Sequence, residues 1–74
     1  MSDPAVHYAE TRYGFEYGAV SIERMYSHKG MVGIRLVCYK TGEYVDVQVS
    51  RAGRKMHIQR GNDKRLQSQP GESR

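Results

Sequence analysis

The sequence has few of the features that staple or anchor a small protein. Its single cysteine, Cys38, cannot form an internal disulfide, which argues against a disulfide-stapled secreted scaffold and favours a reducing compartment. No apolar run approaches the roughly 20 residues that a membrane-spanning helix needs. The opening "MSDPAVHYAE" has neither the basic nor the apolar region of a signal peptide. We therefore expect a cytoplasmic protein that does not enter a membrane.

Patterns that would indicate an enzyme or a cofactor are also missing. His7, His28 and His57 are far apart, without cysteines or carboxylates at the spacing of a metal site. Cys38 falls on the predicted core face, so it is expected to be a small buried hydrophobe and not a nucleophile. The glycines of "GFEYG" lack the Lys and Ser or Thr of a phosphate loop. We expect no catalytic residues, no metal and no cofactor.

What the chain does carry is positive charge in its middle. The net charge is +4 over 74 residues. The net charges of residues 1–12 and 61–74 are −1 and +1 and cancel, so the whole +4 falls in residues 13–60. A basic folded surface favours an anionic partner, nucleic acid first among them. The alternative is that this charge serves solubility alone.

The composition divides the chain into three parts. Residues 1–12 are expected to be a flexible N-terminal segment, and residues 13–60 a single β domain. Residues 61–74 contain one large apolar residue, Leu66, among Gly, Pro and charged side chains, which predicts a disordered polar tail.

Apolar residues in 13–60 recur with period two, which indicates strands and not helices. We predict strands near 19–26, 31–40, 43–50 and 55–59. Their apolar positions are Val20, Ile22, Val32, Ile34, Leu36, Cys38, Val45, Val47, Val49, Met56 and Ile58. This pattern predicts an all-β fold, a small antiparallel meander of four to five strands.

Gly-containing loops between these strands set a register for each hairpin. The predicted loops are His28-Lys29-Gly30, Thr41-Gly42 and Ala52-Gly53. The resulting pairs include Ile22 with Leu36, Leu36 with Val47, Val49 with Met56 and Val47 with Ile58. All three registers place the apolar set on one face, and a slip by one residue would break that agreement.

No amphipathic helix is expected to cover this apolar face. The sheet should therefore close into a small SH3-like barrel or bury the face against a partner, with a homodimer slightly favoured. In "YGFEY", the rings of Tyr13, Phe15 and Tyr17 offer either a fifth strand that closes the barrel or an aromatic lid.

The same registers predict a polar row of Glu23, Arg35, Gln48 and His57 on the opposite face. This row is either a cross-strand salt bridge with hydrogen bonds, or a strip in which Arg35 and His57 donate to an anion. The directly opposed Glu23 and Arg35 favour the salt bridge.

The stretch "RAGRKMHIQR" groups Arg51, Arg54, Lys55, His57 and Arg60 around one hairpin without a carboxylate. The arginine fork suits phosphate oxygens, so the hairpin tip could straddle a nucleic-acid backbone. The alternative is an edge strand whose cations prevent pairing with other sheets.

Two tyrosines complete the set of candidate nucleic-acid-binding residues. Tyr39 and Tyr44 are predicted to lie side by side, where they would stack bases, anchor a protein partner or simply stabilise the hairpin. The whole set is Arg35, Tyr39, Tyr44, Arg51, Arg54, Lys55, His57 and Arg60.

Residues 13–59, with the opening "YGFEYGAVSIER", short hairpins and a polar tail, resemble small uncharacterised β proteins of bacteriophage genomes. The resemblance covers about two-thirds of the chain and implies an accessory factor that binds nucleic acid (DNA or RNA), a host protein or a virion part. It assigns no functional residue. If phage-encoded, the protein would work in the cytoplasm of the host cell. We expect a non-enzymatic binder of the nucleic-acid backbone; the alternative is a protein-interaction or self-assembling module that uses exposed aromatic residues.

Overall fold

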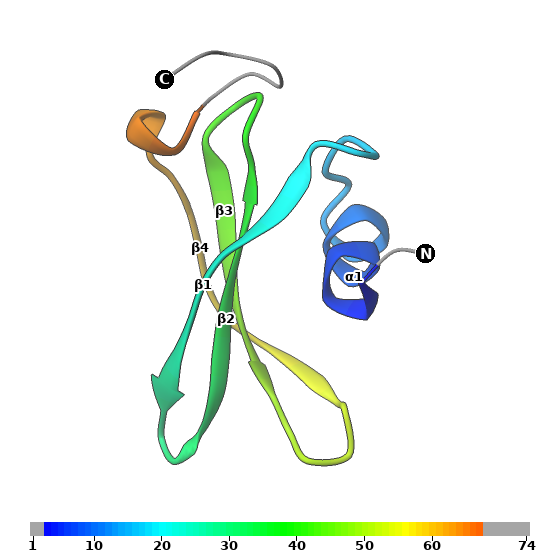
Figure 1. Ribbon diagram of the computed structural model, residues 1–74, viewed down its shortest axis with the longest axis vertical. Coiled ribbons are helices and arrows are strands. Elements are labelled where there is room, and N and C mark those ends of the chain that lie inside the picture. The colour runs from blue at the N-terminus through cyan, green and yellow to red at the C-terminus, as the bar shows by residue number, and fades with distance from the viewer. Residues whose placement is uncertain (1–2, 68–74) are drawn as a thin grey trace.

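The computed structural model describes residues 3–67, which form one antiparallel sheet with a short helix beside it (Figure 1). The elements are α1 (Pro4–Arg12), β1 (Val20–His28), β2 (Met31–Cys38), β3 (Glu43–Val49), β4 (Lys55–Asn62) and the 3₁₀ helix η1 (Lys64–Leu66). The strand order β1-β2-β3-β4 confirms the predicted meander. Because β1 and β4 remain edges, the sheet is open, which excludes the closed SH3-like barrel, one of the two alternatives that the sequence left. None of the helices within residues 3–67 is long and apolar enough to cross a bilayer.

The helix α1 lies where the sequence predicted a flexible segment and no covering helix. Asp3 caps its N-terminus, with Oδ1 accepting a hydrogen bond of 2.8 Å from the Ala5 N–H, and Pro4 occupies the first turn. Its buried residues are Ala5 and Ala9, exposed by 5% and 0%. Because alanine has no bulk beyond Cβ, the helix can approach the sheet closely (Figure 1). The fold is therefore mostly β, not all-β.

The segment between α1 and β1 is not the predicted fifth strand. Phe15 is buried in the core at 5% exposure, and Tyr13 packs beside it with a ring-centroid distance of 6.1 Å. Tyr17 is 82% exposed and does not contribute to the core. The aromatic residues therefore help α1 to cover the apolar face without closing the sheet.

The β1–β2 hairpin keeps the predicted pair Ile22 and Leu36 but differs at its tip. A two-residue turn forms at Lys29-Gly30, where both residues have positive φ (52° and 77°), instead of the predicted three-residue loop. A β-bulge at residue 23 absorbs the difference of one residue. As a result Met25 lies opposite Ile34, on the face that bears the core residues.

The β2–β3 register is shifted by two residues from the prediction. The loop has four residues, 39–42, so Cys38 pairs with Glu43 and Leu36 with Val45. The backbone N–H of Tyr39 donates to the Ala19 carbonyl at 3.0 Å, which keeps Tyr39 out of the predicted pair with Tyr44. Since side chains alternate with period two, a shift of two leaves the apolar set on the same face.

The β3–β4 hairpin also corrects the prediction near its turn. A five-residue loop, 50–54, pairs Val49 with Lys55 and Val47 with His57, where Met56 and Ile58 were predicted. Met56 is therefore 47% exposed and His57 moves to the face of Val47. A bulge beyond His57 restores the predicted parity in the second half of β4.

β4 continues into residues that were predicted to be tail. It includes Gly61 and Asn62, and η1 follows it directly. The Asp63 N–H donates to the Gly42 carbonyl at 2.9 Å, so this segment is tied to the β2–β3 loop. The rest of the predicted tail, 68–74, lies outside the described residues.

The core lies between α1, the Phe15 segment and one face of the sheet. Leu36, Val45 and Val47 are fully buried at 0% exposure. Cys38 is 2% exposed, which confirms its predicted burial.

Candidate functional site

On the face opposite α1, a buried carboxylate joins three strands. Asp46 is 0% exposed and accepts hydrogen bonds from Arg35 Nε at 2.8 Å, from Arg35 Nη2 at 2.9 Å and from Gln59 Nε2 at 2.7 Å. Burial alone would raise the pKa of Asp46, but the hydrogen bonds from Arg35 and Gln59 outweigh it and the pKa is lowered. The same hydrogen bonding raises the pKa of Arg35. This arrangement holds β2, β3 and β4 together.

Arg35 and Tyr44 are thereby engaged within the protein. The Arg35 guanidinium carbon lies 4.2 Å from the centroid of the Tyr44 ring. Tyr44 in turn covers Gly61, where an added Cβ would lie 2.6 Å from the tyrosine hydroxyl. Both side chains are therefore engaged in contacts within the sheet.

The predicted row of Glu23, Arg35, Gln48 and His57 does not form. Arg35 lies opposite Arg24 and Asp46, and its ion pair is with Asp46. Glu23 falls at the bulge of β1, and the two-residue shift of β3 moves Gln48 opposite Gly33. The predicted salt bridge between Glu23 and Arg35 was therefore wrong, and Arg35 forms its cross-strand ion pair with Asp46.

On the α1 side of β4, basic side chains lie against aromatic rings. Lys55 Nζ is 5.8 Å from the centroid of the Tyr8 ring. His57 Nδ1 is 2.8 Å from the Tyr13 hydroxyl oxygen, and the Arg60 guanidinium carbon is 5.5 Å from the Tyr13 ring centroid. These contacts order the side chains along an exposed edge strand. We call Arg54, Lys55, His57 and Arg60 the cationic strip.

Carboxylates are scarce around this strip. Arg60 has one, at 3.7 Å from Glu43 Oε2. Within residues 3–67, no ion pair of 4.0 Å or less includes Arg51, Arg54 or Lys55. Lys55 Nζ donates to the Gly53 carbonyl at 3.3 Å. Arg54 and Lys55 therefore keep their charge available to an external anion.

The tyrosine beside His57 joins two segments of the fold. Burial raises the pKa of Tyr13, and the neighbouring Tyr8 adds to the effect. The Tyr13–His57 contact joins the Phe15 segment to β4.

Tyr39 takes no part in this surface. Its hydroxyl donates to the Gly18 carbonyl at 2.7 Å, and its ring packs against the core. Its neighbour Lys40 is paired with Glu16, at 2.6 Å between Nζ and Oε2. Tyr39 therefore fixes the loop after β2 to the segment before β1.

The structure thus separates the predicted nucleic-acid-binding residues into two groups. Lys55, His57 and Arg60 come together on one side of β4, and Arg51 and Arg54 lie in the adjoining loop, whereas Arg35, Tyr39 and Tyr44 are used internally.

Sequence reasoning missed the aromatic partners Tyr8 and Tyr13. A helix signal was present for the first, since an Asp-Pro pair at residues 3–4 is typical of a helix start. No local signal reveals the bulge in β4 that turns His57 toward Tyr13.

Within residues 3–67, no group of three or more His, Cys, Asp or Glu side chains is arranged to hold a metal ion. Comparisons of the chain with protein-family models, with curated proteins and with solved structures found no match.

Proposed function

We propose that this protein is a non-enzymatic binder of the nucleic-acid backbone that works through the cationic strip. The observation that carries the proposal is the pair Arg54 and Lys55, which no carboxylate within residues 3–67 neutralises at 4.0 Å or less. Two further basic residues, His57 and Arg60, continue the same line along β4. The spacing of phosphates along a strand suits such a line of donors, because each donor can contact a separate phosphate.

The aromatic rings support this function in a second way. Contacts with Tyr8 and Tyr13 order Lys55 and Arg60, so less side-chain entropy is lost when a phosphate binds. The strip presents no set of side chains matched to base edges, so binding should be largely independent of sequence. The resemblance to phage-encoded β proteins supports an accessory role of this kind.

The test is a salt titration of binding to fluorescein-labelled 20-nucleotide DNA and RNA, single-stranded and duplex, of mixed sequence. We expect detectable binding at low salt and a log–log slope of about −2.7 for three duplex phosphate contacts, since each contributes about −0.9. The double variant Arg54→Gln/Lys55→Gln removes two contacts and should flatten the slope by about 1.8.

The matched control removes the same charge elsewhere. Arg24 lies in β1 and Lys29 in the β1–β2 turn, at the opposite edge of the sheet from β4 (Figure 1). The variant Arg24→Gln/Lys29→Gln should keep the wild-type slope. Equal flattening by both double variants would show a net-charge effect, and no binding at low ionic strength would end the proposal.

A further inference from the structure

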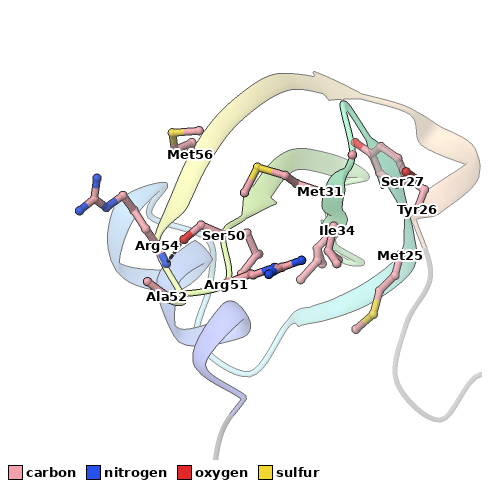
Figure 2. A pocket seen from close by; sticks show the side chains of 13 residues that line it. Met25, Tyr26, Ser27, Met31, Ile34, Ser50, Arg51, Ala52, Arg54 and Met56 are labelled. Atoms are coloured by element: carbon pink, nitrogen blue, oxygen red, sulfur yellow. Dashed lines mark hydrogen bonds between the residues drawn. The ribbon is translucent and has the colours of Figure 1, made fainter.

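A groove separates the ends of the two hairpins (Figure 2). Its volume is about 1190 Å³, enough for the apolar side chains of a short peptide. Most of its lining is apolar: Met25, Met31, Val32, Ile34, Val49 and Met56.

Several of these side chains are unusually exposed. Met25 is 63% exposed, Val32 48% and Met56 47%, and all three lie on this one groove. Single exposed apolar residues are normal, but a cluster on one concave surface is typical of an interaction site. Methionine side chains are flexible and polarisable, so they adapt to ligands of differing shape.

The groove also carries positive charge without a counter-charge. Figure 2 shows the Arg51 side chain extending across it, whereas the Arg54 guanidinium extends away. Arg54 lines the groove near its backbone, where its N–H donates to Ser50 Oγ at 3.0 Å. No Asp or Glu is among the described residues that line this groove. A complementary ligand therefore has apolar side chains flanked by carboxylates.

Two other occupants fit this chemistry poorly. The last seven residues of the chain, "SQPGESR", contain no large apolar side chain. A second copy that presented its own groove would bring its Arg51 toward the first, with no carboxylate in either lining. Like charges that face each other across a desolvated interface are unfavourable.

We propose that this groove, formed by Met25, Val32, Met56 and Arg51, is a docking site for an acidic amphipathic peptide segment of a partner protein. The groove shares only Arg54 with the cationic strip, and it adds a protein partner to the nucleic-acid contact. The apolar side chains of the segment fill the groove, and its carboxylates pair with Arg51.

The experiment uses the full chain and three synthetic peptides of 14 residues. All three share Leu and Phe at positions spaced by three and four, and their remaining positions are Glu, Gln or Lys. We expect the Glu peptide to bind at least tenfold more tightly than the Lys peptide, by fluorescence anisotropy. The charge reversal Arg51→Glu should invert that order, which a non-specific apolar contact would not do.

Apolar contact is tested separately with Met25→Gln/Met56→Gln, which leaves the net charge unchanged. Both residues are about half exposed or more, so the variant should fold, as urea denaturation can show. It should weaken all three peptides at least tenfold while leaving the salt slope for nucleic acid unchanged. Conversely, Lys55→Gln changes a residue of the strip that does not line the groove, and it should keep peptide binding, so the two proposals fail independently.

Four results would overturn the docking site. The peptides could all fail to bind, or bind without regard to their charge. Sedimentation velocity could show a wild-type dimer that Met25→Gln/Met56→Gln dissociates, which would place a second copy in the groove. Nucleic acid could compete fully with the Glu peptide and bind through Met25 and Met56, which would make the groove part of the first surface.

Discussion

Replacement of Asp46 by Asn should be among the most damaging polar substitutions in the described part of the chain. The fully buried carboxylate accepts three hydrogen bonds from Arg35 and Gln59, at 2.7 to 2.9 Å. An Asn amide keeps one acceptor oxygen but turns two donor hydrogens toward these donors. Breaking a buried ion pair from one side costs about 3–5 kcal/mol. Because Arg35 is 18% exposed and keeps its contact with Tyr44, we expect about 3 kcal/mol.

A loss of this size is large for such a small protein. A chain of 74 residues is expected to have about 4–11 kcal/mol of stability in total. Urea denaturation followed by far-UV circular dichroism should therefore show a much lower midpoint with an unchanged m value. The matched control replaces both partners, as Arg35→Met/Asp46→Leu, and should lie within about 1 kcal/mol of wild type. A cost below about 1 kcal/mol for Asp46→Asn would refute the idea that this pair holds the sheet together.

The same residue predicts a pH dependence. The pKa of Asp46 in the folded protein lies below its ordinary value of 3.8. Its contribution to stability is therefore complete above about pH 4 and is lost as the pH falls through the lowered pKa. The free energy of unfolding should fall more steeply between pH 4 and pH 2 in the wild type than in Asp46→Asn. Equal slopes would show that Asp46 titrates alike in both states.

Three further substitutions or reactions test the fold. Gly42→Ala should destabilise the protein more than Gly53→Ala. Both glycines have φ near +83°, but only at Gly42 would an added Cβ lie 2.7 Å from a backbone atom, the Asp63 carbonyl oxygen. The denaturation midpoints of the two variants check this, and equal losses of stability would contradict it. Cys38, at 2% exposure, should react with a thiol reagent only at the rate of unfolding, and labelling within seconds under native conditions would contradict its burial. Ala9→Leu should cost about 1–3 kcal/mol in urea denaturation, because α1 leaves no room at this fully buried position, and a neutral result would show that α1 is not docked.

The homodimer favoured from the sequence stays a prediction. It was argued from an apolar face without cover, and α1 and Phe15 now cover part of that face. Sedimentation velocity across a concentration series checks it, and a monomer throughout would exclude it.

The period-two alternation of apolar residues determined the four strands, their order and the face that packs inward. This held even where a register was wrong, as at Val45 and Val47, because the β2–β3 shift was by two residues and preserved the side-chain alternation. The cluster of cations around residues 51–60 was likewise visible in the sequence.

Only the tertiary structure decided which partners the cations have. The bulges in β1 and β4 turn Met25 and His57 to the α1 side, and a bulge depends on how the whole hairpin twists and packs, not on local residue type. The apolar pattern of the sequence did not reveal α1, because this helix buries two alanines and has no stripe of large apolar residues. Its stability therefore comes from packing against the rest of the fold. Arg35 pairs with Asp46 because the length of the β2–β3 loop fixed which side chains of the two strands face each other. That length depends on contacts of residues 39–42 with distant segments.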